Sequence, residues 1–174
     1  MLVLLTGLLI AILDQATKQI VRLDYTIGES HVVIDGLFSL TYVRNTGAAW
    51  GIFGGQNTAL TVLSIIMLIL MVVFRRSFLS RTWEHNLALG FMVGGIVGNL
   101  MDRLRLGWVT DFFDFYWNGH HFPVFNIADA AICTGVGLYI LSSLWVASHP
   151  LHESQLKSML DPSPVAVKPT DGQS

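Results

Sequence analysis

Charged residues are scarce in this sequence. Asp, Glu, Lys and Arg make up 13 % of its 174 residues, whereas soluble domains average roughly 25 %. The single cysteine, Cys133, excludes an intramolecular disulfide, so cysteine usage does not indicate the redox compartment. The formal net charge of −2 offers no basic stripe for a nucleic acid. The composition therefore argues against a charge-rich soluble domain and against a nucleic-acid partner.

Long apolar runs take the place of the missing charge. Hydrophobic residues make up 52 % of the chain, and the mean hydropathy is +0.56. About 20 helical residues cross the roughly 30 Å of hydrocarbon in a bilayer, and four segments come near that length: about 2–22, 59–74, 87–101 and 127–147. The run from Leu2 to Leu13 lacks a basic n-region and a small-residue cleavage site, so we expect a retained span rather than a cleaved signal peptide. The predicted fold class is an all-α membrane protein with four transmembrane helices.

The connections between these segments differ in length and composition. The first long connection, from about residue 23 to 58, alternates between apolar and polar side chains and contains turn signals. This pattern predicts a small antiparallel β element at the membrane surface. Residues 104–126 combine turn residues with aromatic side chains. After residue 148 the chain is polar and rich in proline. We therefore predict one transmembrane domain over 1–148 and a polar C-terminal tail over 149–174.

The basic residues of the short loops predict the orientation in the membrane. Cytoplasmic loops carry an excess of Lys and Arg, and Arg75, Arg76 and Arg81 lie in the short 75–86 connection. If that connection is cytoplasmic, both termini of this multi-pass chain are cytoplasmic as well. The two long connections then face outward.

Some polar and small residues within the spans need a physical reason. An ionisable side chain in a span is costly unless it is paired. Asp14 and Lys18 lie four residues apart on one helical face with the acid first, which is the favourable order. The pair either neutralises itself or braces an outward-facing site. Gly90, Gly94 and Gly98 recur every four residues, a spacing that lets another helix approach closely.

Asp102 continues the glycine row by one more turn, at the end of the third span. An acid there opposes the helix macrodipole and needs a compensating partner, which we expect to be Arg103 or Arg105. Asn99 lies three residues earlier on the same face and can both donate and accept hydrogen bonds. The favoured interpretation is a bracing network of Asn99, Asp102 and Arg103, with direct catalysis as the alternative.

Asp111 and Asp129 are the candidate catalytic pair. Taken singly, Asp129 fits a helix cap together with Asn126, and Asp111 fits a solvated acid in a connection. Both, however, are expected at the outer boundary of the third and fourth spans. Two carboxylates that share a water cannot comfortably both ionise, so they hold one proton between them. The ionised member, for which the helix N-terminus favours Asp129, can deprotonate water while the other polarises a carbonyl.

Other interpretations draw on other residues. Cys133 is expected to be a buried, inert thiol at membrane depth. His120 and His121, with the two aspartates, could hold a metal in a metal-dependent lipid phosphohydrolase. A small transporter or channel could instead use the ionisable side chains of the spans as a relay.

Five blocks of the sequence, in order over about residues 1–147, resemble the bacterial lipoprotein signal peptidases (type II signal peptidase). The blocks are Asp14–Lys18, Asn45–Gly51, Gly94–Arg103, Gly107–Phe112 and Phe125–Asp129. The resemblance implies an aspartic endopeptidase of the bacterial inner membrane. Its substrates would be prolipoproteins that carry a diacylglyceryl group on the cysteine that becomes the new N-terminus. It also implies two catalytic aspartates, no metal or other cofactor, and inhibition by the cyclic peptide globomycin.

The resemblance carries over to particular positions. Asp111 and Asp129 match the catalytic pair. The positions that match residues supporting the site or contacting substrate are Asn99, Arg103, Asn126, Asn45, Asp14 and Lys18, to which we add Asp102 as a bracing residue. Residues 23–58 are expected to form an extracytoplasmic β-cradle near the active site, and the protein is expected to act as a monomer among membrane lipids. Ala130 stands where relatives often carry a hydroxyl residue, which removes one possible hydrogen bond near the pair.

Overall fold

The computed structural model describes residues 1–47, 54–74 and 83–148. The chain is mostly helical, with one small antiparallel sheet. Its elements are α1 (Leu2–Asp24), β1 (Ser30–Ile34), β2 (Phe38–Asn45), α2 (Asn57–Val73), α4 (Trp83–Leu106), β3 (Val109–Trp117), β4 (His120–His121) and α5 (Ile127–Ser148). The chain divides into two units, Met1–Ser142 and Ser143–Ser174. The sheet and the helix ends next to it belong to the first unit.

Some predicted features lie outside the described residues. They are the second half of the Asn45–Gly51 block, the arginines of the 75–86 connection and the predicted tail over 149–174. Their predictions therefore stay predictions.

Among the described residues, three helices are long and apolar enough to cross a membrane: α1, α4 and the Ile127–Trp145 part of α5. The fourth expected span corresponds to α2, which is apolar but has 17 residues. On α1 the outward side chains are apolar, with Leu4, Leu8 and Ile12 more than half exposed. The same helix buries Asp14 and Lys18 completely. This distribution, apolar outside and polar inside, is the one that a lipid environment favours.

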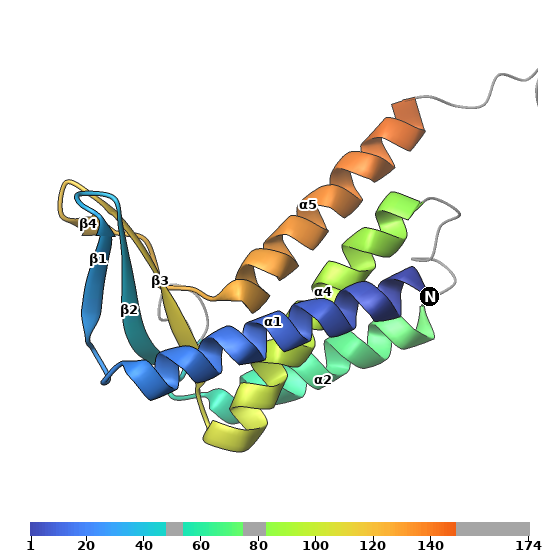
Figure 1. The fold of residues 1–174 in the computed structure, drawn as a ribbon. Coiled ribbons are helices and arrows are strands. Elements are labelled where there is room, and N and C mark those ends of the chain that lie inside the picture. The colour runs from blue at the N-terminus through green and yellow to red at the C-terminus, as the bar shows by residue number, and fades with distance from the viewer. Residues whose placement is uncertain (48–53, 75–82, 149–174) are drawn as a thin grey trace, which may run out of the picture. The chain divides into compact units, whose positions relative to one another are not determined.

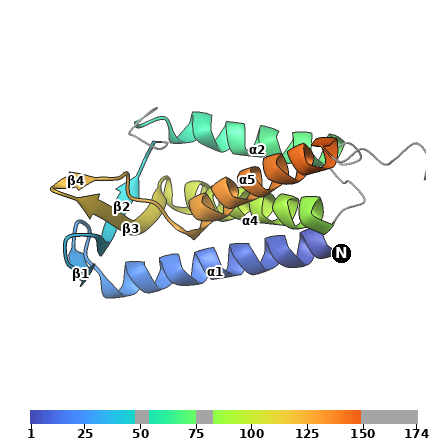
Figure 2. The same ribbon diagram turned by 90° about the horizontal axis from the view of Figure 1, so that it is seen from above.

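The helix α4 packs against α1 and α5 through small residues, and α1 lies beside it in both views (Figures 1 and 2). A Cβ atom at Gly94 would come within 2.6 Å of the Gly7 carbonyl oxygen and 2.8 Å of the Ile10 Cβ. A Cβ atom at Gly98 would overlap the carboxylate of Asp14, and one at Gly95 would overlap the carbonyl oxygen of Ala128 in α5. The predicted packing function of the glycine row is confirmed.

The four strands lie beyond the end of α1 that is away from the N-terminus (Figure 1). They pair in the order β1-β2-β3-β4, all antiparallel. The sheet draws β1 and β2 from residues 23–58, as predicted, whereas β3 and β4 come from residues 104–126, outside the predicted β element. The start of β3 is buried on both faces, so its sequence lacks the alternation that marks a half-buried strand.

The sheet is attached to the helices through a small apolar core. Val21 from α1, Tyr42 from β2 and Phe112 from β3 are all buried and pack together. The register pairs Val43 with Asp111. The sheet thereby holds Asp111 next to the ends of α1 and α4, where the candidate site lies.

We predict that Gly94→Ala destabilises the protein by about 1–3 kcal/mol, because the added methyl group has no space against α1. Gly137→Ala in α5 is the matched control, since a Cβ atom there meets nothing within 4 Å. Unfolding of both variants in detergent micelles measures the difference. Equal stabilities would contradict the packing described for α4.

Candidate active site

The site is built on a buried ion pair within α1. The Nζ of Lys18 lies 2.8 Å from the Oδ2 of Asp14, and both side chains are completely buried. The Oδ1 of Asp14 accepts a hydrogen bond of 2.9 Å from the backbone N–H of Ala128, in the first turn of α5. The predicted pair is therefore present, and it also connects α1 to the start of α5.

Asp102 of α4 is held by groups that the sequence interpretation did not name. Its carboxylate lies 3.5 Å from the Nζ of Lys18 and 3.4 Å from the Nη1 of Arg22. It accepts hydrogen bonds from the Gln15 side chain at 3.1 Å and from the backbone N–H of Thr110 at 2.9 Å. Arg22 follows Lys18 by four residues, so the same helical spacing could have identified it.

Asp102 forms its ion pairs with Lys18 and Arg22 rather than with the predicted Arg103 or Arg105, and Arg103 interacts with it only through its charge. Successive residues of a helix point about 100° apart. When the carboxylate of Asp102 faces α1, the side chain of Arg103 turns away from it. Arg103 instead lines a cavity and donates a hydrogen bond of 3.4 Å from Nη2 to the carbonyl oxygen of Gly47. Two members of the predicted bracing network, Asn99 and Asp102, both contact Lys18. The third member, Arg103, faces the cavity instead.

Two buried asparagines connect this charged network to the candidate pair. Asn99 accepts from the Nζ of Lys18 at 2.8 Å and donates from Nδ2 to the Oδ1 of Asp129 at 2.7 Å. Asn126 donates from Nδ2 to the Oδ1 of Asp111 at 2.6 Å and to the Oδ1 of Asn99 at 3.1 Å. A continuous path of hydrogen bonds thus joins Asp111 to Asp129 through two amides.

The predicted cap at the start of α5 is also present. The Oδ1 of Asn126 accepts from the backbone N–H of Asp129 at 3.0 Å, and the backbone N–H of Asn126 donates to the Oδ2 of Asp129 at 3.2 Å. This reciprocal arrangement is a capping box. The cap does not exclude a link to Asp111, because the Oδ2 of Asp129 binds the backbone of Asn126 while its Oδ1 binds Asn99.

Asp111 occupies a dry position on β3. It is 1 % exposed, and its Oδ2 accepts a hydrogen bond of 2.9 Å from the Nδ2 of Asn45 on β2. Burial, and after it the negative charge of Asp129, raise the pKa of the Asp111 carboxyl to about 7. The interpretation of Asp111 as a solvated acid is therefore wrong. Near neutral pH a large fraction of this carboxyl is protonated.

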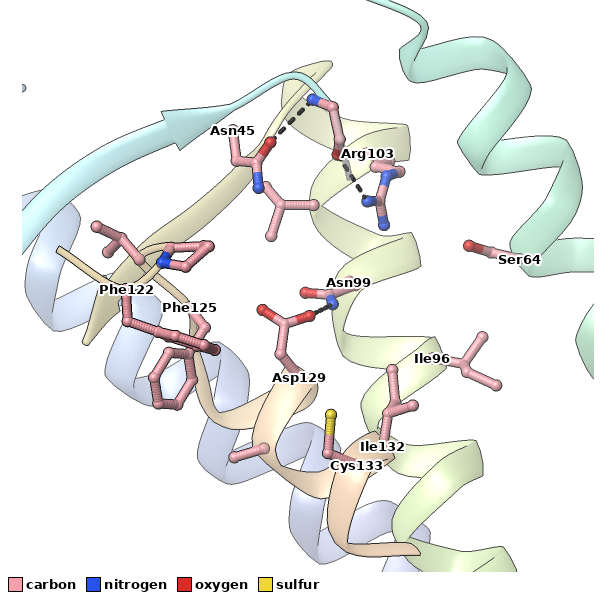
Figure 3. Close-up of a pocket in the computed structure, with 15 residues that line it drawn as sticks. Asn45, Ser64, Ile96, Asn99, Arg103, Phe122, Phe125, Asp129, Ile132 and Cys133 are labelled. Carbon is pink, nitrogen blue, oxygen red and sulfur yellow. Dashed lines mark hydrogen bonds between the residues drawn. The ribbon is translucent and has the colours of Figure 1, made fainter. Parts of the chain in front are cut away.

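A cavity of about 530 Å³ opens beside Asp129. Asp129 is half-buried and lines the cavity, whereas Asp111 lies behind it and is not a lining residue. In Figure 3, Asp129 and Asn99 point toward one another, with Phe122 and Phe125 on one side of them. The other lining residues are largely apolar. Sequence reasoning missed the Phe122–Phe125 wall, because no periodic pattern marks that segment.

The residues of the alternative interpretations lie elsewhere. Cys133 is exposed and lines the cavity one turn after Asp129, so the prediction of a buried thiol is wrong. His121 contacts Asp114 at 2.8 Å rather than Asp111 or Asp129. Within the described ranges, no three His, Cys, Asp or Glu side chains form a group that could hold a metal ion.

Comparison with known proteins places this geometry in a family. The sequence profile described as signal peptidase (SPase) II matches residues 6–145. The lipoprotein signal peptidase of Shewanella pealeana is 45 % identical over 139 residues, which cover 78 % of this chain and 81 % of that protein. The lipoprotein signal peptidase of Geobacter sulfurreducens is 42 % identical over 130 residues, covering 73 % and 81 %. The chain belongs to the signal peptidase II family.

Solved structures of two bacterial membrane enzymes share this fold. A bacterial membrane enzyme determined by the in meso method at 2.3 Å resolution superposes with a TM-score of 0.74. It is 34 % identical, and the match covers 95 % of this chain and 94 % of that one. A second bacterial membrane enzyme, determined by the same method at 1.9 Å, gives a TM-score of 0.73 at 37 % identity, over 82 % of this chain and 92 % of that one.

We predict that Lys18→Met lowers the free energy of unfolding by about 3–5 kcal/mol, because it leaves the buried carboxylate of Asp14 without its cation and that of Asp102 with Arg22 alone. Gln19→Met is the control on the neighbouring, exposed position of α1. Chemical denaturation in mixed micelles measures both variants. A Lys18→Met protein as stable as the control would show that the ion pair does not hold the site together.

Proposed function

We propose that this chain is an aspartic endopeptidase that removes the signal peptide from diacylglyceryl-modified prolipoproteins and cleaves before the lipidated cysteine. One observation carries the proposal. Asp111 and Asp129, far apart in sequence, are linked through the amides of Asn126 and Asn99 beside an apolar cavity. Membership of the signal peptidase II family and the names of the relatives support the substrate class.

The two carboxylates would divide the proton unequally. Asp111 has the drier environment, and its raised pKa supports its assignment as the protonated member. Asp129 lies at the N-terminus of α5, where the helix dipole favours a negative charge, and it accepts hydrogen bonds from Asn99 and from the backbone of Asn126. Asp129 is therefore our candidate for the base.

The reaction then follows the usual course of paired carboxylates. Asp129 takes a proton from a water molecule as its oxygen attacks the carbonyl carbon before the lipidated cysteine, while the proton of Asp111 passes to the carbonyl oxygen. When the tetrahedral intermediate breaks down, Asp129 gives its proton to the amine of the cysteine and Asp111 recovers one from the intermediate. The signal peptide leaves with a new carboxyl terminus, and no cofactor is needed.

The surroundings of the dyad suit a lipidated peptide. The cavity is mostly apolar and can receive the signal segment and the acyl chains, which would otherwise stay in the bilayer. Arg103 and Asn45 place polar groups at its rim, where they can orient the peptide backbone. Globomycin-type cyclic peptides would compete for the same space.

The proposed setting is the bacterial inner membrane. We infer four crossings, by α1, α2, α4 and α5. The 17 residues of α2 extend about 26 Å at 1.5 Å per residue, close to the hydrocarbon thickness. Both termini would be cytoplasmic, the site would lie near the extracytoplasmic face, and one chain would hold all the catalytic groups, so a monomer suffices.

We predict that Asp111→Asn and Asp129→Asn each reduce cleavage of a lipidated precursor by at least about a hundredfold, because each removes one proton-transfer group. Asp114→Asn is the matched control. It lies on the same strand and is also buried, but it contacts Thr41 and His121 instead of the dyad. Cleavage in detergent, followed by the mobility of the product, gives the rates.

Thermal unfolding of the same variants separates catalysis from folding. The proposal requires inactive variants that melt close to the parent protein, with an active Asp114→Asn control. Parental cleavage rates in either dyad variant would remove the proposed mechanism.

A further inference from the structure

The Phe122–Phe125 segment forms an outer edge of the sheet. The backbone N–H of Phe122 donates to the carbonyl oxygen of Phe115 at 2.8 Å. Three residues later, Phe125 and Phe113 exchange hydrogen bonds of 3.2 and 2.8 Å. Two residues of the Phe122–Phe125 segment, Pro123 and Val124, therefore lie opposite one residue of β3, Asp114. This arrangement is a β-bulge, which redirects the backbone at the edge of a sheet.

The bulge leaves backbone groups of Val124 without partners. In an extended strand, the N–H and C=O of neighbouring residues alternate between the two sides. Because those of Phe125 face β3, those of Val124 face away from it. Among the hydrogen bonds of the described residues, neither the N–H nor the C=O of Val124 takes part. Val124 also lines the cavity.

This open edge is continuous with the dyad. Val124 lies two residues before Asn126, whose side chain binds Asp111. It lies five residues before Asp129. Phe125 and Asn126 alone separate Val124 from the start of α5, which carries Asp129 in its first turn. One wall of the cavity is thus formed by the Phe122–Phe125 segment, and the carboxyl of Asp129 lies within a few residues of that segment (Figure 3).

We propose that the residues of the precursor just before the lipidated cysteine bind as an added strand on the backbone of Val124. This inference rests on the proposed function and names how its substrate is held. One substrate residue exchanges hydrogen bonds with the N–H and C=O of Val124, as in other cases of strand addition. Pro123 has no N–H to donate, so the pairing is limited to about one residue. The scissile carbonyl is thereby placed beside Asp129.

The direct test changes the substrate backbone and leaves the enzyme intact. The probe is a synthetic diacylglyceryl-cysteine peptide in which the amide N–H of residue −3, −2 or −1 is replaced, one at a time, by an ester oxygen. Loss of one hydrogen bond should lower kcat/KM roughly fivefold to tenfold at a single position. The other two positions should change little. Equal effects at all three positions, or none at any, would overturn strand addition.

The enzyme supplies the second arm of the test. Val124→Pro removes the N–H, and Val124→Ala keeps it while shortening the side chain. Val124→Pro keeps the carbonyl that would accept the substrate N–H but removes the N–H that would donate to the substrate carbonyl, so its kcat/KM for the all-amide peptide should fall roughly fivefold to tenfold below that of Val124→Ala. Equal kcat/KM values of the two variants for the all-amide peptide would contradict the proposal. If Val124→Pro does not fold, the substrate scan with the parent enzyme decides alone.

These outcomes are separable from the proposed function. If the parent enzyme cleaves the all-amide peptide and the Asp129→Asn variant does not, the proposed aspartic peptidase activity is supported, whatever the result of the ester scan. If cleavage of the all-amide peptide is intact but the three ester peptides give the same kcat/KM, only the strand-addition proposal is contradicted.

Discussion

The carboxylate of Asp14 is the contact on which the positions of three helices depend. One oxygen binds Lys18 within α1 and the other accepts the N–H of Ala128 at the start of α5. The same side chain fills the space left by the missing side chain of Gly98 in α4. A buried carboxylate without these partners would be costly. The three helix contacts therefore form together, and they fix the helix end that carries Asp129.

The charge of Lys18 also sets the direction of the amides at the site. An ammonium group only donates hydrogen bonds, so the oxygen of Asn99 faces Lys18 and its Nδ2 faces Asp129. The amide of Asn126 is oriented similarly, because its oxygen caps the N–H of Asp129 and its Nδ2 is left for Asp111. Two neutral side chains thus carry the orientation imposed by a buried cation to both carboxylates.

Local spacing in the sequence predicted the features that arise within one helix. The apolar runs gave the helices, and the four-residue spacing gave both the Asp14–Lys18 pair and the glycine packing of α4. Features that depend on contacts between distant segments were not predictable in this way. The strand β3 is covered on both faces, and the partners of Asp102 come from α1 and from Thr110. The open edge at Val124 likewise exists only because β3 occupies the other side of the segment.

The central claim is that Asp111 holds a proton that its dry surroundings and the charge of Asp129 keep in place. The most direct measurement is an infrared titration of the carboxyl C=O band that is absent from Asp111→Asn. The band should be present in acid, be lost with a midpoint at about pH 7 as the carboxyl ionises, and move to lower pH in Asp129→Asn, where the neighbouring negative charge is gone. A midpoint near the ordinary aspartate value of 3.8, or one that does not move in Asp129→Asn, would contradict the account.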